Sequence, residues 1–133
     1  MEMAVSFKVN RLSADATGES HFDSFDISCL LKDFAPPAPP FFVSPVEKSS
    51  GYVMIRLPSG WGVGNWHPSP HPQIFFCLSG TARVTASNGD TRLIKAGDAL
   101  LMIDTNGKGH KTEVISDEPV DGVIILLANP TAS

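Results

Sequence analysis

The sequence predicts an all-β protein, built as an antiparallel sandwich or barrel. About eight short apolar or alternating segments follow one another at about ten-residue spacing, which is typical of such folds. The 11 glycines and 11 prolines are scattered at turns, and no helical apolar stripe runs beyond about two turns. A chain of 133 residues fits one domain. We therefore expect a single domain over residues 1–133, with an N-terminal arm and strands over 1–49 and the barrel core over 50–127.

The N-terminal residues carry the weakest strand pattern. Residues 21–27 (HFDSFDI) are expected to form one short strand, although their alternation is poor. The run APPAPP at 35–40 favours the polyproline conformation, which predicts a stiff spacer laid across a sheet. A short apolar strand is expected next, at 41–43.

The remaining strands follow closely. Residues 73–78 are almost continuously apolar, as expected for a strand covered on both sides. Residues 81–86 alternate, and the Asn88-Gly89 pair after them is the strongest short-range hairpin pattern known. The strands expected in the barrel core are 51–57, 73–78, 81–86, 91–94, 99–103, 111–115 and 122–127.

Charge and composition exclude several classes of partner. The net charge of −4 repels phosphate backbones, which argues against nucleic acid. The first residues show no secretory signal, and the longest aliphatic run, Val123 to Ala128, is too short to span a bilayer. Cys29 and Cys77 sit among apolar residues, which favours two reduced, buried thiols. We expect a cytoplasmic protein without a membrane partner.

The unusual segment is WGVGNWHPSPHPQ, at 61–73. Its three alternating prolines exclude a helix and a central strand, so it is expected at a sheet edge or a barrel mouth. In a β conformation, side chains two residues apart share a face, which groups His67, Ser69, His71 and Gln73. In a polyproline conformation the period is three, and only His67 and Gln73 stay together. His71 therefore depends on which conformation the segment adopts.

A second candidate segment is DTNGKGH, at 104–110. Its two glycines and Asn106 predict a loop between strands, and a histidine that ends such a loop can point into a barrel. Asp104 is then either an orienting partner that fixes the His110 tautomer or a solvated loop residue.

Three further side chains have two interpretations each. Trp61 and Trp66 are expected to cap the barrel mouth, and stacking on a ring-shaped ligand is the alternative. Ser20 and His21 are adjacent on a strand, so they point to opposite faces and cannot form a nucleophile and base pair. His21 is expected to be a packed or capping residue rather than part of a pocket.

The two segments resemble the two motifs of small single-domain cupins. The first motif holds H-x-H, then a glutamate, six residues and a glycine, and here His67, Gln73 and Gly80 take the first histidine, glutamate and glycine positions. In the second motif, Gly97 and His110 take the glycine and histidine positions. The resemblance covers about residues 50–127 and implies a cupin-like jelly roll, or double-stranded β-helix. A closer likeness is to uncharacterised cupins with WHPAPRRQ, G-D-x-L-L and D-T-x-G-x-G-H stretches, which implies no assigned reaction.

The departures from the motif affect the metal site that the resemblance implies. A typical metallo-cupin has three histidines and a carboxylate, which suit Zn, Fe, Mn or Ni. Ser69 stands where the second histidine would be, and Gln73 replaces the carboxylate. The ligand set that remains is His67, Gln73 and His110, with His71 in reserve.

Two functions follow from this resemblance. The first is a small-molecule-binding cupin with a degenerate, metal-free pocket. The alternative is a metal-dependent enzyme, of oxygenase or isomerase type, acting on a small organic substrate. A homodimer is also expected, because pairing the open N-terminal strands across a two-fold axis protects their edges. The pocket residues predicted are His67, His71, Gln73, Asp104, His110 and Trp66.

Overall fold

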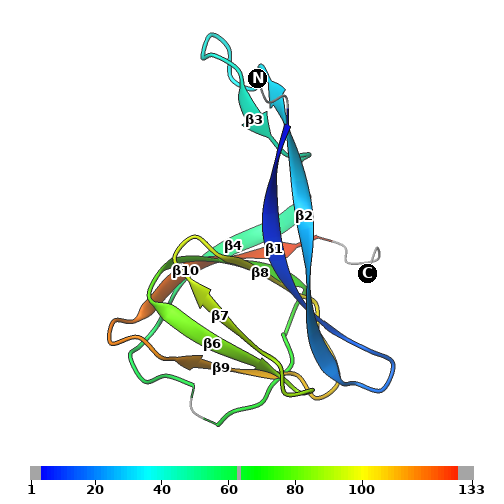
Figure 1. The fold of residues 1–133 in the computed structure, drawn as a ribbon, viewed down its shortest axis with the longest axis vertical. Coiled ribbons are helices and arrows are strands. Elements are labelled where there is room, and N and C mark those ends of the chain that lie inside the picture. The colour runs from blue at the N-terminus through cyan, green and yellow to red at the C-terminus, as the bar shows by residue number, and fades with distance from the viewer. Residues whose placement is uncertain (1–3, 63, 129–133) are drawn as a thin grey trace.

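The computed structural model describes residues 4–62 and 64–128. This part of the chain forms ten β-strands and no helix (Figure 1). A seven-stranded sheet has the order β3-β2-β1-β8-β5-β10-β4, and a three-stranded sheet has the order β7-β6-β9. Neighbouring strands are antiparallel except for β1 and β8. The strands are β1 (Ala4–Ala14), β2 (Ser20–Lys32), β3 (Phe41–Val43), β4 (Ser49–Leu57), β5 (Gln73–Ser79), β6 (Thr81–Ala86), β7 (Thr91–Lys95), β8 (Ala99–Met102), β9 (His110–Val114) and β10 (Val120–Leu127).

The core lies between the two sheets, which face each other as the halves of a jelly roll that is not closed into a continuous barrel. Strands β5, β6 and β8 contribute alternate side chains to this core, as the period of two requires, with Phe75 and Cys77 from β5 as an example. The all-β prediction is confirmed, and the strands expected after residue 40 agree with the observed ones to within about two residues. The largest fully buried apolar side chains are Leu12, Ile94, Leu100 and Val120.

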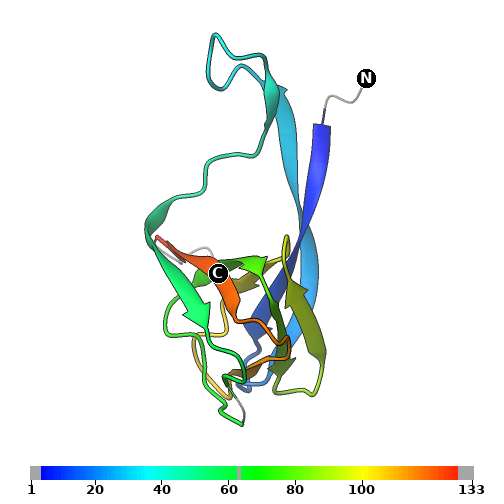
Figure 2. The ribbon, with the colours of Figure 1, turned by 90° about the vertical axis from the view of Figure 1, so that its left-hand side faces the viewer.

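The N-terminal arm is longer than the sequence predicts. The short strand expected at 21–27 is part of a hairpin of an 11-residue and a 13-residue strand, β1 and β2. Figures 1 and 2 show the upper part of this hairpin, with β3 at its end, projecting beyond the other strands. The buried residues Val9 and Leu12 are three positions apart, so they lie on opposite faces of the strand, and only Leu12 belongs to the core. A search for period-two alternation therefore misses β1.

The APPAPP prediction is wrong. The segment forms a turn in which the Ala38 N–H donates to the Ala35 carbonyl oxygen at 2.9 Å. This turn lets β3 fold back on β2, with Lys32 opposite Phe41. The prolines therefore connect two paired strands and do not form an extended spacer.

Strand β5 is covered on one face only by the residues that the structure describes. Phe75 and Cys77 are buried in the core, whereas Phe76 and Leu78 on the opposite face are 39% and 56% exposed. The sequence predicts a strand covered on both sides, so the outer face of β5 remains without the cover that its composition suggests.

Cys29 and Cys77 are both buried free thiols, and burial raises the pKa of Cys77. Residues 4–62 and 64–128 contain no helix with the length and apolarity needed to cross a membrane.

Candidate functional site

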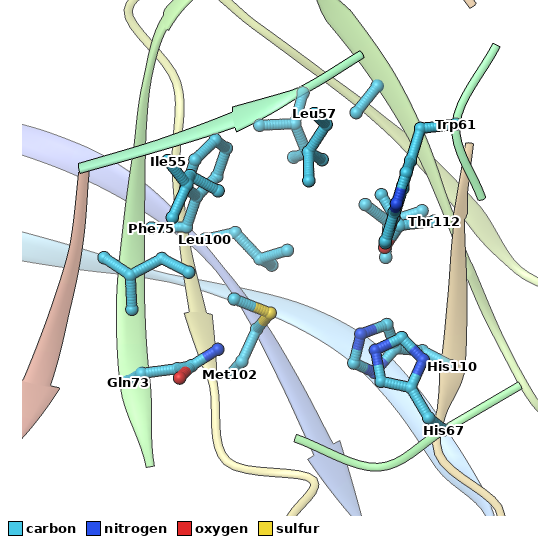
Figure 3. A pocket seen from close by; sticks show the side chains of 14 residues that line it. Ile55, Leu57, Trp61, His67, Gln73, Phe75, Leu100, Met102, His110 and Thr112 are labelled. Carbon is cyan, nitrogen blue, oxygen red and sulfur yellow. The ribbon is translucent and has the colours of Figure 1, made fainter. Parts of the chain in front are cut away.

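A cavity of about 120 Å³ opens between the two sheets (Figure 3). Most of its wall is apolar and comes from both sheets, with Phe75 and Leu100 on one side and Val84 and Ile94 on the other. Four polar side chains interrupt this wall, and they come from the 61–73 segment, β5 and β9. They are His67, Gln73, His110 and Thr112.

His67 and His110 lie side by side on one wall of the cavity (Figure 3). The N–H of each residue donates to the carbonyl oxygen of the other at 2.9 Å, which forms an isolated antiparallel bridge. The ring centroids are 4.8 Å apart. Gly109 permits this approach, because it has a φ of +75° and a Cβ there would lie 2.2 Å from the His67 carbonyl carbon. The glycine before the second histidine therefore brings the two motifs together.

Asp104 fixes the orientation of His110. The Asp104 carboxylate is fully buried, and its Oδ2 lies 2.6 Å from His110 Nδ1. Its Oδ1 accepts a hydrogen bond from Ser69 Oγ at 2.7 Å, and the Ser69 N–H donates to the Asp104 carbonyl oxygen. Because a carboxylate only accepts, the hydrogen of the neutral imidazole resides on Nδ1, and Nε2 keeps its lone pair. Asp104 is a buried partner of His110, not a solvated loop residue.

Gln73 faces the two imidazoles from the opposite side of the cavity (Figure 3). It is the first residue of β5 and is paired with Met102 and Leu126. No hydrogen bond within the described residues engages its side-chain amide. Every fully inaccessible side-chain polar atom in those residues has a partner, so the unpartnered amide atoms must be accessible. Because Gln73 lines the cavity, they are accessible from there.

The structure separates the other predicted site residues from this group. His71 does not line the cavity, and its Nε2 lies 3.2 Å from the Leu127 carbonyl oxygen. Trp66 lies outside the cavity wall, with the Lys111 ammonium 5.3 Å from its ring centroid, whereas Trp61 lines the cavity. Of the four side chains that a β conformation would group, His67 and Gln73 line the cavity, whereas Ser69 contacts Asp104 and His71 contacts the Leu127 carbonyl oxygen. Outside this segment, His21 faces Ser13 at 3.4 Å.

Two residues contribute to the site in ways that the sequence did not indicate: Thr112 was not considered, and Ser20 was considered only as a nucleophile. Thr112 lines the cavity. It lies two residues after His110 on β9, so the period of two places both side chains on the same face and could have indicated this. Ser20 is fully buried, and its Oγ donates to the Gly109 carbonyl oxygen at 2.7 Å. No local pattern distinguishes such a serine from an exposed one, because its partner is 89 residues away.

The donor set does not fit the metal site that cupins commonly carry. His67 and His110 supply two imidazoles, and the residue opposite them is a neutral amide. Both oxygens of the nearby Asp104 carboxylate are engaged by His110 and Ser69. Within residues 4–62 and 64–128, no group of three or more histidines, cysteines or acidic residues is placed to hold a metal ion. A third strong ligand is missing for a closed transition-metal site.

The fold and the cavity define a jelly-roll protein with a polar cluster in an otherwise apolar cavity between its two sheets. The chain belongs to the cupin family, because the Cupin_2 family, described as a cupin domain, matches residues 53–126. This confirms the resemblance drawn from the two motifs. A search of curated proteins found no match.

Solved structures similar to this chain include the cupin domain of Cnp3 from Schizosaccharomyces pombe. It is 15% identical, with a TM-score of 0.51, over 99% of this chain and 88% of that one. A predicted oxalate decarboxylase from Thermotoga maritima is 20% identical over 90% of this chain and 92% of its own, with a TM-score of 0.43. A cupin protein from Bacteroides fragilis is 28% identical over 59% of this chain and 66% of its own, with a TM-score of 0.42. The Cnp3 similarity supports the fold and assigns no reaction.

Proposed function

We propose that the protein binds a small organic molecule in the cavity between the two sheets. The observation that carries the proposal is the set of accessible polar atoms, from His67, His110 and Gln73, inside an otherwise apolar wall. An apolar pocket with a few convergent polar groups is the usual form of a small-molecule site. A ligand that satisfies these polar groups and fills the apolar space gains from both contacts.

The competing hypothesis is a metal-dependent enzyme with His67, His110 and Gln73 as ligands. It requires an amide oxygen to act as the third donor, and such a neutral ligand is weaker than a carboxylate. Metal analysis of protein purified without a histidine tag distinguishes the two. About one transition-metal ion per chain would favour the enzyme, and a trace amount favours the binding protein.

A cavity-filling variant tests the proposal directly. A set of small organic fragments is screened by thermal shift against the wild type and Val84→Phe, because Val84 lines the cavity. Leu93→Phe is the matched control, since Leu93 is exposed on β7 and does not line the cavity. At 100 times its Kd, a ligand stabilises the folded state by about 2.7 kcal/mol. We expect a fragment to raise the melting temperature of the wild type and of Leu93→Phe, but not that of Val84→Phe. An equal rise in Val84→Phe would contradict the proposal.

We also propose that the protein is a cytoplasmic homodimer. The proposal is supported by apolar side chains that a single chain leaves exposed on the two faces of the arm, Phe7 on one and Leu30 on the other, and by the open edge at β3. A second copy that covers them removes both an apolar surface and an edge available for uncontrolled pairing. The two free cysteines agree with a reducing compartment.

A further inference from the structure

The charge of the cavity wall limits what it can bind. Among the described residues, 4–62 and 64–128, no lysine, arginine, aspartate or glutamate lines it. A ligand ammonium group would lose its hydration there without meeting an opposite charge, and a carboxylate or phosphate would meet one only at a protonated imidazole of His67 or His110; both arrangements are costly. The wall therefore favours an uncharged occupant.

The size of the cavity sets a second limit. At about 120 Å³ it is close to an engineered apolar cavity of about 150 Å³ that binds benzene. One six-membered ring, or a branched aliphatic group of similar bulk, fills the enclosed part. The Trp61 side chain lines the same cavity and supplies an aromatic surface for such a group.

The hydrogen-bonding polarity of His110 sets the third limit. Asp104 holds the hydrogen of the neutral imidazole on Nδ1, so Nε2 offers a lone pair to the cavity. Ser69 reinforces this polarity by donating to the second carboxylate oxygen. The ligand group that pairs with this nitrogen must therefore donate a hydrogen bond to it.

We propose that the occupant is a small uncharged hydroxyl compound, a phenol or an alcohol, whose O–H donates to His110 Nε2 while its apolar body fills the cavity. The Gln73 amide, across the cavity, supplies a donor for the hydroxyl oxygen. This inference rests on the proposed small-molecule function and narrows it to one chemical class. Ser69 and Asp104 act as positioning residues, because they touch His110 or each other and not the cavity space.

The first test measures the tautomer without any ligand. Nitrogen-15 NMR of the imidazoles identifies which nitrogen carries the hydrogen, and the neutral His110 ring is expected to carry it on Nδ1. In Asp104→Asn the side-chain amide can donate to Nδ1, and the expected tautomer is protonated on Nε2. Asp98→Asn is the control, since Asp98 lies in the β7–β8 turn and accepts from the Lys95 N–H. If Asp104→Asn fails to fold, the wild-type spectrum alone decides: a His110 protonated on Nε2 overturns the proposal.

The second test compares four ligands that share one ring: phenol, toluene, benzoate and benzylamine. In calorimetry with the wild type, phenol is expected to bind at least tenfold more tightly than the other three. Asp104→Asn is expected to bring phenol and toluene within about threefold of each other. Equal binding of phenol and toluene, or tighter binding of benzoate, overturns the hydroxyl assignment.

The same data separate this inference from the broader function. If none of the four binds but other uncharged fragments do, with loss in Val84→Phe, the hydroxyl class is wrong and the small-molecule function stands. If no fragment depends on Val84, both proposals fail.

Discussion

His110 Nδ1 lies 2.6 Å from Asp104 Oδ2, and the two side chains are only 4% and 0% exposed. The residues are at opposite ends of the loop that joins β8 to β9. One contact therefore closes the loop and orients the imidazole that ends it. The chain uses a buried carboxylate to position a histidine at the place where the cupin resemblance implies a metal ligand.

Ser69→Ala tests the support of this carboxylate. The variant leaves Asp104 Oδ1 buried without its side-chain donor. An unsatisfied buried polar atom costs about 1–3 kcal/mol, so the free energy of unfolding is expected to fall by that amount. Urea unfolding measures it. Ser28→Ala, at an exposed position of β2, is the control and should change stability by less than about 0.5 kcal/mol. Equal stability of the two variants would show that Ser69 contributes nothing.

Gly109→Ala tests the approach of the two motifs. A methyl group at this position would meet the His67 backbone at 2.2 Å and would also sit on a positive φ. Gly97→Ala is a matched control, because its φ is +94° and nothing lies within 4 Å of its Cβ position. The control should lose about 1–2 kcal/mol of stability from φ alone. Gly109→Ala should lose clearly more and should displace the His67 and His110 NMR signals. Equal losses would mean that the close contact is easily relieved.

Gln73→Glu tests whether the neutral amide at position 73 is the reason that the donor set does not fit a metal site. The substitution places a carboxylate opposite the two imidazoles, as in the motif that the sequence departs from. Calorimetry with Zn²⁺ or Ni²⁺ on tag-free protein should show affinity at least about tenfold above the wild type. Adding His67→Ala should remove the gain. A gain that survives this second change would place the metal elsewhere.

The Arg11–Asp23 pair predicts a pH dependence of stability. Its two hydrogen bonds, of 2.8 and 2.6 Å, lower the pKa of Asp23. A lowered folded-state pKa stabilises the protein above the unfolded value of about 4, and this stability is lost as the pH falls through the folded value. Asp23→Asn should lower stability at pH 7 by at most about 1 kcal/mol, because the pair is partly exposed. Urea unfolding across pH should show this difference shrinking below about pH 4. A constant difference would exclude the ionic origin.

Phe7→Ser with Leu30→Ser tests the proposed dimer. Both side chains are exposed on the arm, away from the core. Light scattering after size-exclusion chromatography should give a dimer for the wild type and a monomer for the double variant. Leu93→Ser, an exposed change on β7, should remain dimeric. A monomeric wild type at tens of micromolar would contradict the proposal.

The sequence predicts best where local chemistry decides the structure. Asn88 and Gly89 form the expected hairpin turn, and the Asp90 N–H donates to Asn88 Oδ1 at 3.0 Å. Gly97 and Asp98 likewise make the expected turn. These features depend on residues within one turn of each other, so a short window contains the information.

Features set by distant contacts were harder to predict. The arm hairpin gains its order from cross-strand pairing, such as Arg11 with Asp23, and not from a period-two apolar face. The sequence pairs His67 with Gln73 on one face, but the direction of Ser69 toward Asp104 depends on a partner 35 residues away. The volume of the cavity follows from the packing of both sheets and has no local pattern at all.

The most direct measurement of the central claim, that the cavity is a ligand site, uses two methionine methyl groups. Met102 lines the cavity, and Met54 is exposed on β4. During an NMR titration with the fragment that stabilises the protein most, the Met102 methyl signal should move to saturation while the Met54 signal stays fixed. The Met102 shift should disappear in Val84→Phe. A stationary Met102 signal at saturating fragment would contradict the account.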